Sequence, residues 1–240
     1  MSDDDSSRPS YDFLAGAMLL VDKPQGWTSF DVVNKIRYKL KNSLKVSQIK
    51  VGHAGTLDPM ATGLLILCTG KATRQIDEYQ GLPKTYTGTF RLGATTPSYD
   101  AETDIDETFP IDHITEEMLE SARRQFLGVI SQVPPMFSAI KVDGQPLYKK
   151  ARKGETIEVK AREVRIDSFD LTRVELPDID FHVQCSKGTY IRSLAHDYGK
   201  ALHSGAYLTA LRRTAIGPYR VEDAWSVEQW VQYLEAADFS

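Results

Sequence analysis

Strand-like and helical segments follow one another irregularly along the chain, and this order restricts the fold most. Residues 84–93 alternate between two faces with the two-residue period of a half-buried strand. The run GLLILCTG at residues 63–70 is typical of a short buried strand, whereas residues 28–42 place three apolar side chains on one helical face. Because this is not the strict strand–helix–strand order of a parallel sheet, the sequence predicts an α/β (α+β) protein built on a mixed sheet.

The remaining elements follow from the same periodicities. Strands are expected near 17–23, 156–176, 179–186 and 206–221, and helices over 115–128, after 146, over 188–202 and over 226–237. The helix at 28–42 is expected to begin with Thr28 or Ser29 as its N-cap. Residues 94–110 are expected to form a polar, acidic loop.

The chain is expected to form one domain. Its 240 residues, 41% of them apolar, suffice for a large core, and no Pro/Gly/Ser-rich linker divides them. We expect this domain over 15–240, with a short C-terminal extension at about 213–240. The acidic, polar residues 1–14 are expected to be a flexible tail.

The sequence predicts a cytoplasmic protein. It contains no run of about 18 apolar residues that could span a membrane. Its acidic N-terminus is the opposite of a signal or transit peptide. Cys68 and Cys185 lie in apolar runs and are expected to be small core residues of a reduced protein.

Charge is distributed unevenly, although the net charge is only −4. Residues 32–50 carry six Lys/Arg and no acid, whereas residues 99–120 carry nine Asp/Glu and no base. Phosphate binding depends on such local clusters rather than on net charge. The alternative is that each run is simply a solvated face.

Asp58 is the only charged side chain in VGHAGTLDPMATGLLILCTG, residues 51–70. Pro59 disfavours helical backbone at Asp58, and the surrounding glycines allow tight turns or close approach to a ligand. A carboxylate in apolar surroundings needs a cation or hydrogen-bond donors, or it will protonate. Asp58 is therefore a candidate nucleophile; the alternative is an aspartate that closes its own turn.

Arg192 is the best candidate for the cation that Asp58 needs. It lies in the first turn of a predicted helix, where a positive charge opposes the helix dipole. A specific anionic partner explains an arginine there, and a bidentate pair with Asp58 would keep that carboxylate ionised. The alternative is an exposed arginine without a special partner.

Other site chemistries fit the sequence poorly. The Gly-Lys pair at 70–71 lacks the earlier glycine of a phosphate-binding loop, and no Gly-x-Ser-x-Gly motif occurs. The five histidines and two cysteines offer no metal-ligand set of four. The sequence therefore favours a metal-free nucleophilic site beside a surface for a polyanion.

Six motifs resemble, in order, those of the TruB family of bacterial tRNA pseudouridine synthases. They are LLVDKPQGWTSFDVV, VGHAGTLDPMATGLLILCTGKATR, KTYTGTFRLGATTPSYDAE, VPPMFSAIKVDGQPLYKKARKGE, CSKGTYIRSLAHDYG and YLTALRRTAIGPY. The resemblance extends from Leu19 to about Arg213. It implies a catalytic domain of the pseudouridine synthase fold, with a mixed, mainly antiparallel central sheet flanked by helices and loops.

The resemblance implies an isomerase that converts uridine 55, in the T-loop of tRNA, to pseudouridine. Asp58 would be the catalytic aspartate that promotes cleavage of the N-glycosidic bond of a flipped-out uridine. The uracil would then rejoin the ribose through C5, and which atom Asp58 attacks stays open. The detached base is also the incoming nucleophile, so we expect no metal and no cofactor. A carboxylate is a reasonable nucleophile at a glycosidic carbon.

The resemblance also assigns the other site residues. Tyr86 would stack on the base and could take the C5 proton, and Arg192 would pair with Asp58. Substrate-binding roles fall to His53, Tyr190, Leu211 and Lys23. Without the family context, Tyr86, Tyr190 and Leu211 could be plain core residues and His53 a structural histidine.

The implied partner is the T-arm of tRNA, bound by a monomer. Residues 32–50 and 141–165 are the candidate contact surfaces. Pro146 stands where relatives often carry a base, Phe137 stands where tyrosine is frequent, and the extra C-terminal RNA-binding module of many relatives is missing.

Three rival functions stay open at this point. The chain could be a tRNA-binding module without catalysis, or a nucleoside or glycoside hydrolase that uses Asp58 as one of two carboxylates. It could also be a guide-RNA-dependent synthase. Intact Asp58, Tyr86 and Arg192 count against the first, no nearby second acid supports the second, and the missing module disfavours the third.

Overall fold

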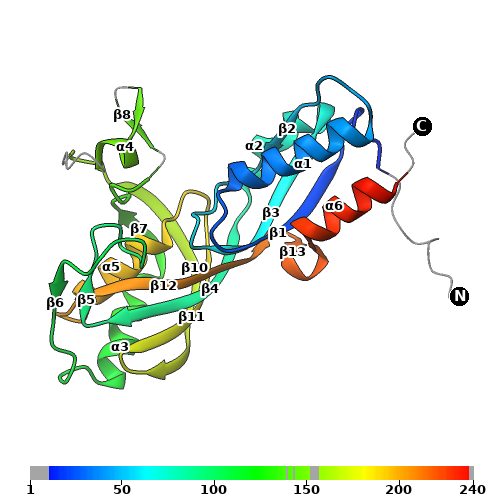
Figure 1. The fold of residues 1–240 in the computed structure, drawn as a ribbon. Helices are drawn as coiled ribbons and strands as arrows, with labels where there is room; N and C mark the ends of the chain where they lie inside the picture. The colour runs from blue at the N-terminus through cyan, green and yellow to red at the C-terminus, as the bar shows by residue number, and fades with distance from the viewer. Residues whose placement is uncertain (1–10, 139, 143, 152–156, 238–240) are drawn as a thin grey trace, which may run out of the picture. The chain divides into compact units, whose positions relative to one another are not determined.

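The computed structural model describes residues 11–138, 140–142, 144–151 and 157–237. The chain forms two compact units (Figure 1). The first unit consists of Met1–Gln80 and Tyr219–Ser240, and the second of Gly81–Pro218. The single domain over 15–240 stays a prediction.

Four of the described strands in the first unit pair with one another. The central strands are β1 (Met18–Lys23) and β3 (Thr62–Thr69), which pair antiparallel with Lys23 opposite Gly63. Strand β2 (Val51–His53) also pairs antiparallel with β3. Strand β14 (Trp225–Ser226) pairs in parallel with β1. The sheet is thus mixed, as the sequence predicts.

Two helices of the first unit lie side by side (Figure 1). The first, α1 (Ser29–Ser43), begins at Thr28, whose side chain and that of Asp31 form a capping box. The second, α6 (Val227–Ala236), begins at a similar box between Ser226 and Gln229. The expected helical face is buried, and its side chains share one core with β1, β3 and α6: Leu19, Val21, Val32, Ile36, Leu40, Leu65, Leu67, Trp230 and Leu234. The helix expected from residue 28 is confirmed.

Two aromatic residues from the expected tail belong to this core. Phe13 is 1% exposed, and Tyr11 stacks on it with ring centroids 5.3 Å apart. Tyr11 also meets the edge of Trp230 at 5.4 Å. The expectation of a flexible segment therefore does not hold for these residues, because they bury large apolar area. Residues 1–10 of the expected tail lie outside the described residues.

The second unit is built on an antiparallel sheet with the order β12–β4–β11–β10–β7. The bounds are Ala206–Ile216 for β12, Lys84–Leu92 for β4, Asp178–Cys185 for β11, Arg162–Glu175 for β10 and Gly128–Gln132 for β7. The strand expected from residue 156 begins only at Arg162. The mainly antiparallel character of the predicted sheet is confirmed.

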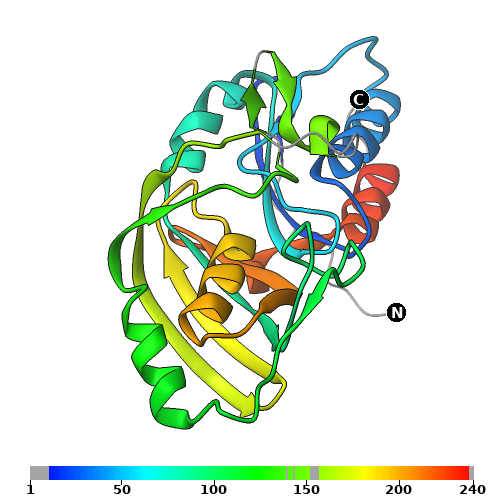
Figure 2. The ribbon, with the colours of Figure 1, turned by 90° about the vertical axis from the view of Figure 1, so that its left-hand side faces the viewer.

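Helix α5 (Ile191–Ala201) packs beside β12 (Figure 2). Its Tyr198 lies against Phe90, with ring centroids 5.8 Å apart, and Phe90 stacks on Phe181 at 4.2 Å. The Tyr198 hydroxyl donates a hydrogen bond to the Leu119 carbonyl of α3 (Glu116–Arg124) at 3.0 Å. The apolar stripe expected on the helix at 188–202 is thus buried, as predicted.

Short elements complete the chain. They are η1 (Gly70–Gln75), α2 (Ile76–Gly81), β5 (Ala94–Thr95), β6 (Glu107–Thr108), β8 (Lys141–Val142), β9 (Gln145–Pro146), α4 (Leu147–Ala151), β13 (Tyr219–Arg220) and η2 (Val221–Asp223). The segment expected as an acidic loop therefore contains the two-stranded β5–β6 sheet.

Cys68 and Cys185 are both buried and free of disulfide bonds, as the sequence predicts. Burial raises the pKa of each thiol to about 11. None of the described helices is long and apolar enough to cross a membrane.

Candidate active site

Asp58 lies in the first unit, on the loop that joins β2 to β3, and is half-buried. Its neighbours on both sides are held in place. The Leu57 N–H donates to the Ser29 hydroxyl at 2.8 Å, and the Gly26 N–H donates to the Pro59 carbonyl at 2.8 Å. Both partners come from the segment that enters α1. The backbone on either side of this carboxylate is therefore fixed by residues distant in sequence.

The glycines around Asp58 allow the tight path that the sequence predicts. Gly55 and Gly63 have φ angles of +95° and +105°, which side chains with a Cβ rarely adopt. Gly52 has another role, because a Cβ there would come within 2.7 Å of the Ile76 side chain.

His53 and Lys23 also belong to the first unit. His53 is the last residue of β2, opposite Leu67, and is half-buried. Lys23 is fully buried, and its Nζ donates to the carbonyls of Pro24 at 3.0 Å and Trp27 at 2.6 Å. Lys23 thus stabilises the turn before α1, and its expected substrate-binding role stays a prediction.

Tyr86 and Leu211 lie on one face of the second unit's sheet. Tyr86 of β4 faces Arg213 of β12, and Gly88, two residues on, faces Leu211. Opposed residues of antiparallel strands share a face, so Tyr86 and Leu211 are diagonal neighbours. Each is 8% exposed. Tyr86 thus lies on the same sheet face as Phe90, against which Tyr198 of α5 packs.

Tyr190 is the N-cap residue of α5 and is held by two neighbours. Its N–H donates to Gln132 Oε1 at 2.8 Å, and its carbonyl accepts from Gln132 Nε2 at 3.1 Å. The Arg162 guanidinium lies over its ring, 4.8 Å from the centroid. These two partners could not be predicted from the sequence, because β7 and β10 bring them to α5 only in the folded sheet.

Arg192 is 3% exposed and has a carboxylate partner within its own unit. Its Nε lies 3.6 Å from Oδ2 of Asp100, which is fully buried. Its Nη1 and Nη2 donate to the carbonyls of Ser98 at 3.2 Å and Phe137 at 2.8 Å. Asp100 is thus an anionic neighbour of Arg192 that was not predicted from the sequence. The pair with Asp58 stays a prediction.

Asp100 is itself held by hydrogen bonds. The Ser98 hydroxyl and the Glu102 N–H donate to its Oδ1 at 2.5 and 3.0 Å. Asp100 is the first acid of the charge run at 99–120, and its burial could not be predicted from the charge of the run as a whole. The adjacent strand-like run and turn residues in ATTPSYD were the available signal.

A second contact joins the same turn to α5. The Tyr99 ring stacks on His196 with centroids 3.9 Å apart and planes 11° from parallel, and Tyr99 has a φ angle of +63°. Burial, with a smaller contribution from the charge of Lys200, lowers the pKa of His196 to about 4. His196 follows Arg192 by one helical turn. The stack and the ion pair therefore hold the 98–100 turn against consecutive turns of one helix.

The surroundings of Tyr86 are strongly cationic. Lys84, on the same strand, and Arg213, opposite Tyr86, are both buried. Burial lowers the pKa of Lys84 to about 8, and the charge of Arg213 contributes in the same direction. The second unit thus offers buried positive charge and aromatic surface, which suit a planar substrate bearing negative charge.

Within the described ranges, no group of three His, Cys, Asp or Glu could hold a metal ion. The groups that could do chemistry are a half-buried carboxylate in the first unit, and a tyrosine and a buried arginine in the second.

Residues 41–191 match the profile described as "TruB family pseudouridylate synthase (N terminal domain)". This match covers more than half of the chain. The chain belongs to the TruB family of pseudouridylate synthases. Residues 192–238 match the "tRNA pseudouridylate synthase B C-terminal domain". The resemblance found in the sequence is thereby confirmed, and the chain is a pseudouridine synthase, an isomerase.

Individual relatives support the assignment over nearly the full chain. A protein of Flavobacterium johnsoniae named "tRNA pseudouridine synthase B" is 56% identical over 225 residues, which cover 93% of this chain and 98% of that protein. A protein of Phocaeicola vulgatus with the same name is also 56% identical, over 93% of this chain and 95% of that protein.

The fold resembles longer chains from solved complexes. A chain from the "Crystal Structure of a Cbf5-Nop10-Gar1 Complex" matches with a TM-score of 0.69 and 30% identity, over 92% of this chain and 55% of that one. A chain from the "Structure of H/ACA RNP bound to a substrate RNA containing 2'-deoxyuridine" matches with a TM-score of 0.66 and 27% identity, over 92% and 54%. This chain therefore spans about half the length of those proteins.

Proposed function

We propose that this protein isomerises uridine 55 in the T-loop of tRNA to pseudouridine, with Asp58 as its nucleophile. The observation that carries the proposal is the half-buried Asp58 on a loop held on both sides, by Ser29 at Leu57 and by Gly26 at Pro59. Such a loop presents one carboxylate in a fixed direction. The substrate class is supported by the relatives named tRNA pseudouridine synthase B. The match to one of them extends over 98% of that relative's length.

The proposed reaction moves one bond and needs no second reactant. Attack by the Asp58 carboxylate, either at the ribose or at the base, promotes cleavage of the bond between N1 and the ribose C1′. The uracil rotates, and its C5 forms the new bond to C1′ while the bond to Asp58 is released. The proton lost from C5 is balanced by one gained at N1, so product and substrate are isomers.

The other side chains would bind the base and move this proton. Tyr86 would stack on the uracil and accept the C5 proton, and the face it shares with Leu211 supports a flat, apolar wall. Tyr190 would line the uridine pocket, held by Gln132, and Leu211 would close its apolar side. Arg192 would keep Asp58 ionised, and His53 would help to hold the opened loop. The fully buried Lys23 would support substrate binding through the turn that it stabilises.

The target base must leave its stack, which costs a few kcal/mol. Phosphate contacts from residues 32–50 and 141–165 would offset this cost; of the second segment, residues 143 and 152–156 lie outside the described residues. The partner would be the T-arm, bound by a monomer in the cytoplasm. Two departures bear on this surface: Pro146, and Phe137, whose carbonyl accepts from Arg192.

The test is tritium release from an unmodified tRNA transcript labelled at uridine C5. We expect about one equivalent from the wild-type enzyme, and none from Asp58→Asn or from a transcript with cytidine at position 55. Asp58→Asn should still bind tRNA, because its side chain keeps nearly the same shape. No release by the wild type despite tight tRNA binding would favour a binding module, and release by both proteins would exclude Asp58 as the nucleophile.

A further inference from the structure

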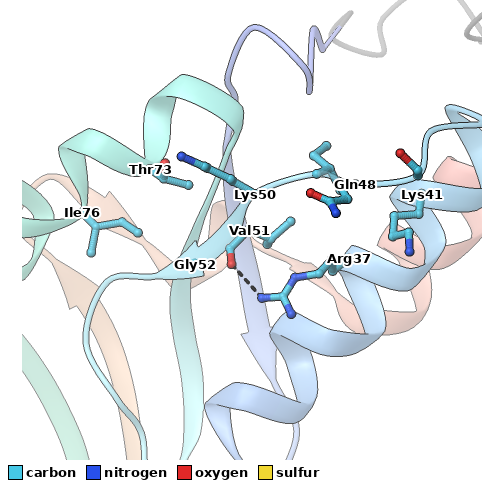
Figure 3. A pocket seen from close by; sticks show the side chains of 10 residues that line it. Arg37, Lys41, Gln48, Lys50, Val51, Gly52, Thr73 and Ile76 are labelled. Carbon is cyan, nitrogen blue, oxygen red and sulfur yellow. Dashed lines mark hydrogen bonds between the residues drawn. The ribbon is translucent and has the colours of Figure 1, made fainter.

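A pocket of about 540 Å³ lies entirely within the first unit (Figure 3). Its walls come from the C-terminal half of α1, the segment 47–52, and the η1 and α2 turns that follow β3. Three positive side chains line it: Arg37, Lys41 and Lys50. Gln48 and Thr73 add neutral hydrogen-bonding groups.

Within the described ranges, no carboxylate compensates the charge of this pocket. No Asp or Glu is among its lining residues. Among the described residues, Arg37, Lys41 and Lys50 make no ion pair with a carboxylate. The chain as a whole has a net charge of −4, so concentrating three unpaired cations at one concave site needs an explanation. Like charges held close repel one another unless an anion lies among them.

Arg37 is oriented for a ligand. Its Nη2 donates to the Val51 carbonyl at 2.9 Å, as Figure 3 shows, and its Nη1 donates to Asn34 Oδ1 at 3.2 Å. A guanidinium carries five N–H donors, so these two bonds fix the plane and leave donors for an anion. In Figure 3 the Lys50 side chain extends toward Thr73, on the other side of the 47–52 segment.

We propose that this pocket binds a backbone phosphate of the RNA substrate, at a point outside the uridine pocket. Lys50 directly precedes β2, and His53 follows it by three positions, a distance of about 10 Å in an extended chain. An RNA chain engaged at the His53–Asp58 loop would therefore pass the pocket. This inference rests on the proposed function in that it takes RNA as the ligand.

Two exposed aromatic residues favour RNA over a small free anion. Phe30 and Tyr38 on α1 are 60% and 62% exposed. Tyr38 directly follows Arg37, and positive grooves with aromatic side chains beside them are typical of surfaces that bind single-stranded nucleic acid. Free nucleotides carry the same phosphate chemistry, so the test must separate the two sources.

The test compares two double variants that remove the same charge. Lys41→Gln/Lys50→Gln changes the pocket, whereas Lys71→Gln/Lys200→Gln changes exposed lysines that neither line it nor belong to segments 32–50 and 141–165. Arg37 is kept because it supports Val51. Kd for the unmodified tRNA transcript is measured between roughly 50 and 200 mM salt, together with the single-turnover rate at saturating tRNA and the thermal unfolding midpoint.

For the pocket variant we expect a roughly tenfold higher Kd and a salt slope lower by one to two, because each phosphate contact contributes about 0.7–0.9 to that slope. The control should change Kd by no more than about threefold, because exposed lysines act only through screened charge. The rate at saturation should be unchanged for both. Equal Kd values and slopes for the two variants would overturn the phosphate site.

The outcomes separate this inference from the proposed function. A wild-type enzyme that binds tRNA with the expected slope but releases no tritium would contradict the proposed reaction and leave the phosphate site standing. Uridine monophosphate is the probe for a small ligand. Uridine monophosphate could raise the unfolding midpoint of the wild type but not of the pocket variant, while the wild type and the pocket variant bind tRNA equally. In that case the pocket binds a free nucleotide, and our inference fails.

Discussion

Arg192 and Asp100 form a buried pair, in which Nε of Arg192 lies 3.6 Å from Oδ2 of Asp100. Arg192 is 3% exposed, and Asp100 is fully buried. A buried ion pair does not by itself stabilise a fold strongly, but loss of one member leaves an uncompensated charge. The pair fixes the position of an arginine for which the sequence predicts a role at the catalytic carboxylate. Asp100 is therefore a positioning residue in this structure.

Asp100→Asn should destabilise the protein by about 3 kcal/mol, because the buried Arg192 would lose the charge of a buried carboxylate beside it. The new amide oxygen can still accept from Ser98 and Glu102, so the turn itself should persist. Urea unfolding measures the change. Asp104→Asn, an exposed acid of the same segment, is the matched control and should change stability by less than about 0.5 kcal/mol. Equal effects of the two would contradict a structural role of the pair.

Tyr86→Phe should bind tRNA normally but release tritium at least about a hundredfold more slowly. The ring for stacking is kept, whereas the hydroxyl proposed to accept the C5 proton is lost. Tyr79→Phe, which changes a tyrosine packed against Tyr219, serves as the control. A normal release rate for Tyr86→Phe would remove Tyr86 as the base while leaving its stacking role intact.

Ser29→Ala should cost about 1–3 kcal/mol, since the buried Leu57 N–H loses its acceptor. It should also lower the single-turnover rate, because the same bond fixes the loop of Asp58. The comparison is Ser43→Ala, whose hydroxyl donates to Leu234 at the other end of α1. That variant should lose stability without losing rate, and a full rate for Ser29→Ala would show that the loop does not need this bond.

Gly88→Ala should be strongly destabilising. A Cβ at this position of β4 would come within 2.7 Å of the Phe181 ring and would also meet the Ala210 carbonyl. The backbone of a central strand cannot shift without disturbing its pairing. We therefore expect the free energy of unfolding in urea to fall by about 2–3 kcal/mol. At Gly81 a Cβ would meet nothing within 4 Å. Gly81→Ala should therefore be close to neutral, and a neutral Gly88→Ala would mean that the sheet adapts.

His196 should make the protein less stable as pH falls. Burial lowers its pKa from 6.5 to about 4, so the unfolded chain binds more protons than the folded protein between these values. The free energy of unfolding must then fall as pH drops through this window. His196→Phe keeps a ring against Tyr99 and cannot titrate, so its stability should change less between pH 6.5 and 4. Parallel curves for the two proteins would contradict this assignment.

Local features of this protein could be predicted from its sequence. Thr28 and the spacing of Val32, Ile36 and Leu40 predicted α1 correctly, because capping and helical periodicity act within a few residues. The alternation around Phe90 likewise predicted β4. The ordered motifs around Asp58 and Arg192 indicated the family, which the comparisons confirm.

Only the tertiary structure decided which distant residues meet. Arg192 lies beside the buried Asp100, an acid from the run at 99–120, and Phe13 of the expected tail belongs to a core. Residues of the basic run at 32–50 line a pocket only because η1 and α2 supply its other wall. Side-chain periodicity encodes the direction in which a residue points on its own element. What lies opposite depends on strand pairing, register and loop path, which are set by the free energy of the whole fold.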